Sequence, residues 1–224
     1  MIHKFKNAPR FGAVLALLAA PTVFAAGGHH GVDDAAMLDA GVCKVEGWST
    51  HNRGDGRALH AGTGCRVGSV EVSLGWDRER ENRAITRSYG LAIKWAHEVR
   101  EGLSLGLSAA PGWQSGARPR YQATAVTGLV TWQAAEAVRL HANLGRNLAH
   151  RAADETRSGV SADWTFQPDW QVMAERYRVD GGHFARAGMR WTPAKGWALD
   201  ASRAHHISGT GVSGWTLGFT REFD

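Results

Sequence analysis

Neighbouring histidines occur twice in this sequence, and their spacing could bind a metal ion. If the mature chain began at Gly27, its terminal amine, two backbone amides and the His29 imidazole could hold Cu(II) or Ni(II) in a square plane, beside His30. A metal patch of His205 and His206 with His51 or His60 would need the later pair to lie in a loop, since strand neighbours point to opposite faces. We favour a polar lead-in and a solvated loop for the two pairs, and expect no cofactor.

A hydrolytic site would need His141 and Asn143, which the alternation of the chain places on one face of a strand. Asp163 or Arg157 on the following strand would lie nearby. The same alternation turns His141 away from lipid, and no serine has matching spacing. We therefore expect that the protein is not an enzyme, with a lipid hydrolase as the weakest of three readings.

The elements that position these side chains are strands, because apolar residues recur with a period of two. Residues 70–76 (VEVSLGW) alternate apolar side chains with Glu71, Ser73 and Gly75. The same alternation recurs over 138–144, 160–166 and 215–219. About twelve strands follow, and the phase of the sixth is ambiguous. They are 42–52, 57–67, 69–77, 84–98, 102–110, 120–132, 137–146, 157–166, 170–178, 183–191, 197–204 and 212–223.

The connections between these strands alternate in length. The even-numbered ones are short, as at Gly68 and 100–102, whereas most odd-numbered ones are longer and polar, as at 111–119 and 147–156. The first odd connection, at 53–56, is tight. Outer-membrane barrels have short periplasmic turns and longer outer loops, which a soluble β-sandwich has no reason to show. The pattern predicts an all-β, antiparallel, up-and-down transmembrane barrel.

Charged residues of both signs fall on the face predicted to line the lumen. We expect five of them to set the selectivity of a pore, since lumen charge tunes which solutes pass. The mixture of signs does not decide between an aqueous pore and a salt-bridged filling. The five residues are Lys94, Glu98, Arg139, Glu175 and Arg190.

Cys43 and Cys65 are the only cysteines, and the tight turn at 53–56 can place them opposite one another on the first hairpin. Directly opposed strand positions need only a small adjustment to reach disulfide distance. Exported proteins meet an oxidising compartment. We predict a Cys43–Cys65 disulfide, with two free thiols as the alternative if the register slips by one residue.

The amino-terminal residues carry the three parts of an export signal. Lys4, Lys6 and Arg10 precede an apolar stretch, and small residues at 23 and 25 favour cleavage after Ala25. We expect a signal peptide over 1–25, a periplasmic lead-in over 26–41 and a barrel over 42–224. The formal charge of +5 suits contact with anionic lipid headgroups. The sequence has no stripe of Lys and Arg interleaved with aromatic residues, so we do not expect nucleic acid as a partner.

Residues 28–35 (GHHGVDDA), with Gly41, Cys43, Glu46 and Trp48, resemble the start of small proteobacterial outer-membrane barrels, as does the strand 140–145 (LHANLG). These are similar to the meta-pathway phenol-degradation type, often labelled putative transporters. The resemblance implies passage of small aromatic or hydrophobic molecules and carries over no binding residues. The last strand resembles the signal read by barrel-assembly machinery, although it ends on Asp224 rather than an aromatic residue.

We therefore expect a monomeric barrel in a bacterial outer membrane, in contact with lipid and lipopolysaccharide. The favoured function is a passive channel for small solutes. The alternative is a filled barrel that acts structurally or through its loops.

Overall fold

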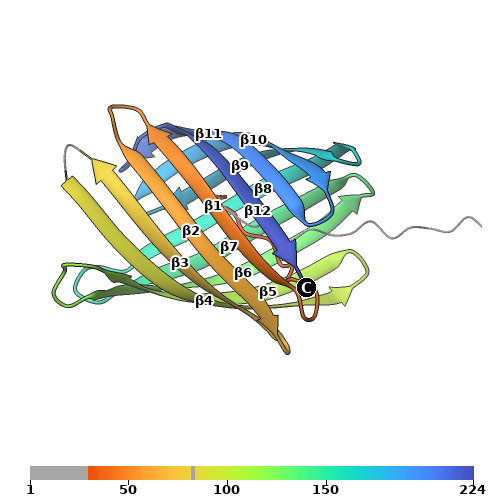
Figure 1. Ribbon diagram of the computed structural model, residues 1–224, viewed down its shortest axis with the longest axis horizontal. Helices are drawn as coiled ribbons and strands as arrows, with labels where there is room; N and C mark the ends of the chain where they lie inside the picture. Colours follow the sequence, from red (N-terminus) through yellow and green to blue (C-terminus); the bar gives the residue numbers. More distant parts are fainter. Residues whose placement is uncertain (1–29, 82–83) are drawn as a thin grey trace, which may run out of the picture.

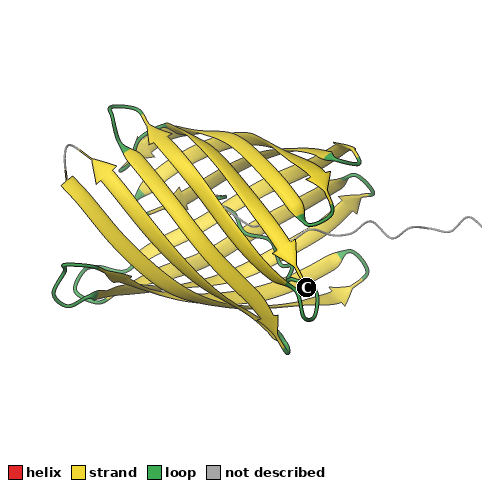
Figure 2. Ribbon diagram, viewed as in Figure 1, coloured by secondary structure: helices red, strands yellow, loops and turns green. Residues whose placement is uncertain are grey.

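Twelve antiparallel strands close into one barrel in the structure, a computed structural model that describes residues 30–81 and 84–224 (Figures 1 and 2). The strands are β1 (Cys43–Asn52), β2 (Arg57–Val67), β3 (Val70–Glu81), β4 (Ala84–Arg100), β5 (Leu103–Gln114), β6 (Tyr121–Ala135), β7 (Val138–Ala149), β8 (Glu155–Gln167), β9 (Trp170–Val179), β10 (Gly182–Ala194), β11 (Trp197–Gly209) and β12 (Gly214–Phe223). Across the described ranges, no helix has the length and apolar character to cross a membrane.

The barrel closes because the first and last strands pair. Cys43 lies opposite Phe223 and Asn52 opposite Gly214, while every other strand pairs with its neighbours in sequence order. Closure leaves no sheet edge exposed, as a lipid-embedded sheet requires. The predicted barrel class is confirmed, and each of the twelve predicted segments overlaps an observed strand.

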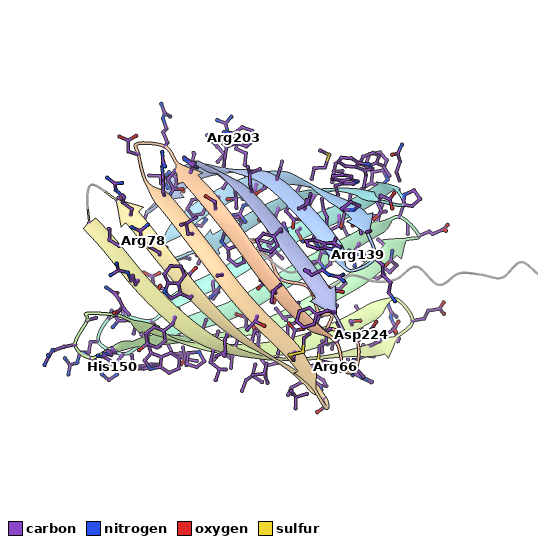
Figure 3. The ribbon with its side chains drawn as sticks, in the orientation of Figure 1. Arg66, Arg78, Arg139, His150, Arg203 and Asp224 are labelled. Carbon is purple, nitrogen blue, oxygen red and sulfur yellow. A yellow bond between two sulfur atoms is a disulfide. The ribbon has the colours of Figure 1, made fainter. Side chains whose placement is uncertain are left out.

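Five short turns gather at one end of the barrel, which we call the turn end. Two residues connect β2 to β3, β4 to β5, β6 to β7, β8 to β9 and β10 to β11. Gly68 and Gly102 have φ of 62° and 72° in such turns, a conformation that glycine adopts without steric cost. Arg66, Arg139 and the carboxy-terminal Asp224 lie toward this end in Figure 3.

The opposite end, which we call the loop end, has shorter connections than the sequence predicts. The strands continue into segments expected to be loops, so that only 115–120 remain between β5 and β6, and 150–154 between β7 and β8. Asn147 still pairs with Glu155, and Gln114 donates from its backbone to the Arg120 carbonyl at 2.8 Å. Backbone pairing therefore overrides the polar composition of these segments.

The predicted loop around His205 and His206 is wrong for the same reason. Both residues lie in β11, where His205 pairs with Ala185 and His206 with Phe184. Strand neighbours point to opposite faces, so these two rings cannot bind one ion together.

The outer wall is apolar, and aromatic side chains lie toward both ends of its strands. Trp132, Trp164, Trp191, Trp197 and Phe223 are exposed near the turn end, and Trp76, Tyr89 and Trp215 nearer the loop end. Exposed leucines and valines occupy strand centres, with Leu144 at 69 % exposure. Two aromatic girdles around an apolar band are typical of a wall that faces lipid.

The inner wall carries the alternate residues and settles two predictions. In β6, Ala125, Thr127 and Leu129 face the lumen, and Val126 and Val130 therefore face outward, which resolves the ambiguous phase. Cys43 lies opposite Cys65 in the β1–β2 ladder, and the two form the predicted disulfide.

Candidate functional site in the lumen

Charged residues of both signs lie on the lumen wall, and most of them form ion pairs. Arg190 binds Asp200 through two hydrogen bonds of 2.7 and 3.2 Å. Arg139 lies 3.5 Å from Asp163. Further pairs on the wall are Lys44–Glu71 at 3.1 Å, Lys44–Glu46 at 3.6 Å and Arg186–Glu175 at 3.2 Å. Low-dielectric surroundings require such pairing, since an isolated buried charge is costly.

The five residues predicted to set selectivity divide into three groups. Lys94 and Glu175 are buried and contact the segment that precedes β1, as described below. Arg139 and Arg190 form the ion pairs given above with Asp163 and Asp200. Glu98 is exposed at the turn end, where its Oε1 accepts from the Gly102 amide at 2.8 Å.

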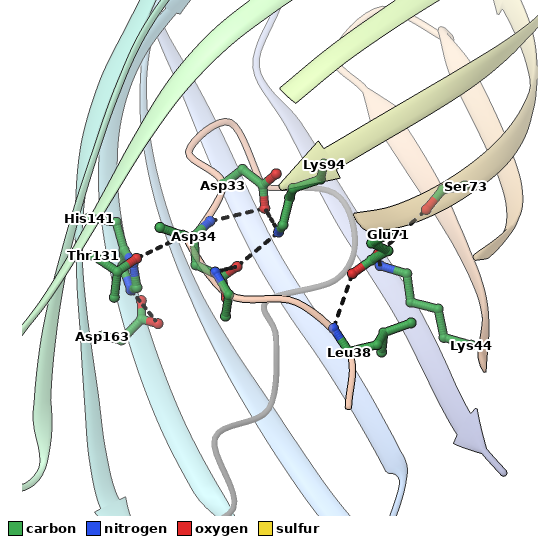
Figure 4. Close-up of polar contacts among 12 residues, drawn as sticks. Asp33, Asp34, Leu38, Lys44, Glu71, Ser73, Lys94, Thr131, His141 and Asp163 are labelled. Carbon is green, nitrogen blue, oxygen red and sulfur yellow. Dashed lines mark hydrogen bonds and ion pairs between the residues drawn. The ribbon is translucent and has the colours of Figure 1, made fainter. Parts of the chain in front are cut away.

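A segment of the chain itself lies inside the barrel. Residues 31–39, which we call the plug, run through the lumen before the chain enters β1 (Figure 4). Val32, Ala35 and Leu38 have exposures of 2 to 3 %, and Asp34 of 1 %. The sequence reading placed these residues in a periplasmic lead-in. In the structure these residues are buried against lumen side chains, and they fill part of the lumen.

Glu175 of β9 binds the first residues of the plug. Its two carboxylate oxygens accept from the Gly31 amide at 3.0 Å and the Val32 amide at 2.9 Å. The Arg186 guanidinium lies 3.2 Å from the same carboxylate. Hydrogen bonds to a charged acceptor are stronger than neutral ones, so this contact fixes one end of the plug firmly.

A polar chain on the β6–β8 wall binds the middle of the plug. The Ala35 amide donates to Thr131 Oγ1 at 2.8 Å, and that hydroxyl lies 2.8 Å from His141 Nδ1. His141 Nε2 lies 3.2 Å from Asp163 Oδ2. A threonine, a histidine and an aspartate in series resemble a hydrolytic triad, but here the hydroxyl is the acceptor for the plug backbone.

Lys94 of β4 binds both aspartates of the plug. Its Nζ lies 3.1 Å from Asp34 Oδ1 and 3.3 Å from Asp33 Oδ1 (Figure 4). On the other side, Asn143 is oriented so that its amide pairs with the Asp33 backbone, accepting from N at 2.7 Å and donating to O at 2.8 Å. The plug backbone is therefore held by side chains, much as a strand is held by a neighbour.

The last part of the plug is held near the turn end. The Leu38 amide donates to Glu71 Oε2 at 3.2 Å, and its carbonyl accepts from Arg66 Nη1 at 3.1 Å. The Glu71 carboxylate also binds Lys44, which joins the plug to the ion-pair network of β1 and β3.

Two glycines let the plug lie close to the wall. A Cβ at Gly159 of β8 would lie 2.5 Å from Val32 Cγ2, and a Cβ at Gly31 would lie 2.5 Å from the Tyr177 ring. Both distances are shorter than any ordinary carbon contact. Plug and wall are therefore complementary in shape as well as in hydrogen bonding.

A cavity of about 270 Å³ remains in the lumen beside the plug. Its walls come from β1 and from β3 to β8, and Gly31 and Asp33 contribute to it from the plug. Three cations and three anions line it, together with small residues such as Ala92 and Ala110. A bound water occupies about 30 Å³, so the cavity has room for a solute of several heavy atoms.

The sequence pattern places Lys94 and Glu175 on the lumen face but does not predict the plug that they contact. Thr131, Asn143 and Gly159 were not singled out as binding residues, because the segment they contact shows no strand or helix periodicity. The metal candidate His29 and the signal peptide lie outside the described residues. His30 lies in the lumen and lines the cavity.

The comparisons agree with the barrel geometry. A family model described as "Uncharacterised conserved protein UCP029691" matches residues 14–223. No curated protein matches the chain by sequence.

Solved structures show the same fold at very low identity. The KdgM porin superposes with a TM-score of 0.67 at 8 % identity, covering 81 % of this chain and 99 % of its own. The NanC porin gives 0.59 at 7 % over the same shares, and Omp33 of Acinetobacter baumannii gives 0.52 at 12 %, covering 81 % and 97 %. These are outer-membrane barrels, so the likeness supports the barrel class and leaves function to the lumen of this chain.

Proposed function

Since the chain belongs to the family of uncharacterised conserved protein UCP029691, we propose a function from the lumen of this chain itself. The protein is an outer-membrane channel for small solutes, and its plug closes the channel. The observation that carries this proposal is a polar lumen, partly open as a cavity, inside an apolar wall. A structural barrel needs no such space, because side chains could fill it.

The plug must leave the lumen before the channel can open fully. Its hydrogen bonds go to side chains of the wall rather than to a strand edge, so it can leave without unpairing any strand. Each of these bonds contributes about 0.5–3 kcal/mol, and water would replace them on release. We propose that solutes pass when residues 31–39 move out of the lumen.

The solute class is part of this proposal. The resemblance to phenol-degradation barrels favours small aromatic molecules, and one structural neighbour is titled the toluene transporter TbuX of Ralstonia pickettii, with a TM-score of 0.50 at 9 % identity. Another is titled as a complex of the KdgM porin with oligogalacturonate. The polar lining of the cavity in this chain favours charged solutes over hydrocarbons.

Single-channel conductance in a planar bilayer tests the channel. We compare the chain beginning at Ala26 with a variant lacking residues 31–39, and with a control that begins at His30 and keeps the plug. The deletion should give steady current steps several-fold larger than those of the other two proteins, because the occupied cross-section of the lumen is freed.

A folded deletion variant that passes no current would contradict the proposal. It would favour the second candidate, a filled barrel that acts structurally or through its loops. The plug and the ion pairs of the lumen are the observations that support that candidate. An enzymatic function has less support, since Thr131 and His141 lie beneath the plug.

A further inference from the structure

Four polar side chains lie along one register row of the lumen wall. Lys94 pairs in register with Ser108, Ser108 with Thr127, Thr127 with Gly145, and Gly145 with Arg157. Four of these five residues have a side chain that can donate a hydrogen bond, and all four line the 270 Å³ cavity: Lys94, Ser108, Thr127 and Arg157. We call these four residues the polar track.

The polar track leads from the loop end of the barrel to the plug. Arg157 lies near the loop end of β8, whereas Lys94 lies nearer the turn end of β4 and binds Asp33 and Asp34. Gly145, between Thr127 and Arg157, has no side chain to interrupt the wall, and a Cβ there would lie 2.2 Å from the Val126 carbonyl oxygen. A solute entering from the loop end therefore meets donors in sequence.

The charges along the track favour an anion. Lys44 is committed to Glu46 and Glu71, and Lys94 to the two aspartates of the plug. Within the described part of the chain, the Arg157 guanidinium makes no ion pair or side-chain hydrogen bond. A guanidinium binds planar carboxylates through two parallel hydrogen bonds, which makes carboxylate the group that it suits best.

The plug shows which group Lys94 accepts. The two groups bound to its ammonium are the carboxylates of Asp33 and Asp34, so the protein itself supplies carboxylates at the far end of the track. We infer that the cavity binds small organic carboxylates at Arg157, Thr127 and Ser108, and that Asp33 and Asp34 occupy the position such a solute takes at Lys94. A carboxylate that reaches Lys94 competes with the plug.

This inference rests on the proposed channel function, because it names the solute class, but its test needs no bilayer. Isothermal titration calorimetry on the chain beginning at Ala26, in detergent at low ionic strength, compares succinate with its neutral isostere succinamide. Succinate should bind at least tenfold more tightly. Equal binding of the two would overturn the inference.

Variants at Arg157 and at the plug aspartates, each with a control, locate the binding site. R157Q should weaken succinate binding at least tenfold and R157K less, while R178Q is the matched control, since Arg178 is exposed on the outer wall beside Ser158. D33N/D34N should strengthen succinate binding about tenfold by removing the competing carboxylates, and D39N should not, because the Asp39 side chain is exposed. Unchanged affinity in R157Q, or in a folded R157K if R157Q does not fold, would overturn the inference.

The outcomes separate the two proposals. Succinate binding by a protein that never conducts contradicts the channel and leaves the site intact. Conducting pores without succinate binding contradict the carboxylate site alone.

Discussion

Individual residues decide how tightly the plug fits, and their roles depend on contacts across long sequence separations. The amides of Gly31 and Val32 bind a carboxylate 144 and 143 residues away, and the Ala35 amide binds a hydroxyl 96 residues away. The period-two pattern predicts that Glu175 and Lys94 face the lumen, because direction depends only on strand phase. It cannot predict their partners, because residues 31–39 have no periodicity that places them.

The fit of Val32 against Gly159 leads to a residue-scale prediction. In G159A the new methyl group would lie 2.5 Å from Val32 Cγ2, so Val32 must leave its site. Losing the burial of a valine costs about 1.5 kcal/mol, which is about tenfold in an equilibrium between bound and released plug. Hydrogen exchange of residues 31–39 should accelerate about tenfold. G112A is the control, since the nearest atom to a Cβ there is 4.0 Å away, and equal acceleration in both variants would contradict the prediction.

At the scale of elements, the strands are predictable and the connections are not. Alternation gives the face of each strand, and this is why Cys43 and Cys65 pair as predicted. The loop lengths expected at the loop end are wrong, because segments expected to be loops, such as 147–149, continue the strand ladder. The residue composition of a segment indicates whether its side chains are buried. A strand that extends beyond the membrane needs only a neighbouring strand that offers backbone hydrogen bonds.

The first hairpin gives the prediction at this scale. Its disulfide closes a loop between residues 43 and 65 and removes conformational freedom from the unfolded chain. A C43S/C65S variant should lose about 2–4 kcal/mol of unfolding free energy. Urea unfolding in lipid vesicles, followed by tryptophan fluorescence, measures this loss. Wild-type protein with dithiothreitol should match the variant, and an unchanged urea midpoint in both would exclude the constraint.

The whole molecule presents opposite chemistry on its two surfaces, which is the arrangement of a bilayer-spanning barrel. The lumen holds the ion pairs, and the outer wall holds exposed leucine, valine and aromatic side chains. The period-two alternation of the sequence predicts which side chains face outward and which face the lumen. It does not predict whether the lumen is filled, because that depends on the position of a segment without periodicity.

Depth in the bilayer is the prediction at this scale. Leu144 lies at the centre of β7 on the outer wall and is 69 % exposed, whereas Leu148 lies near the loop end and is 42 % exposed. L144R should cost about 2–4 kcal/mol of folding free energy in vesicles and L148R about 0–1 kcal/mol. Equal costs in the two variants would argue that this wall does not span a membrane.

Residues 40–42 join the plug to β1, and this covalent link sets a threshold for any competing solute. A segment joined to its site by a short linker acts at an effective concentration on the order of millimolar. Free carboxylate in dilute surroundings therefore loses the competition for Lys94, and carboxylate near that concentration wins it. The barrel would then respond to abundance: closed when its solute is scarce, and open when the solute is plentiful enough to replace the two aspartates.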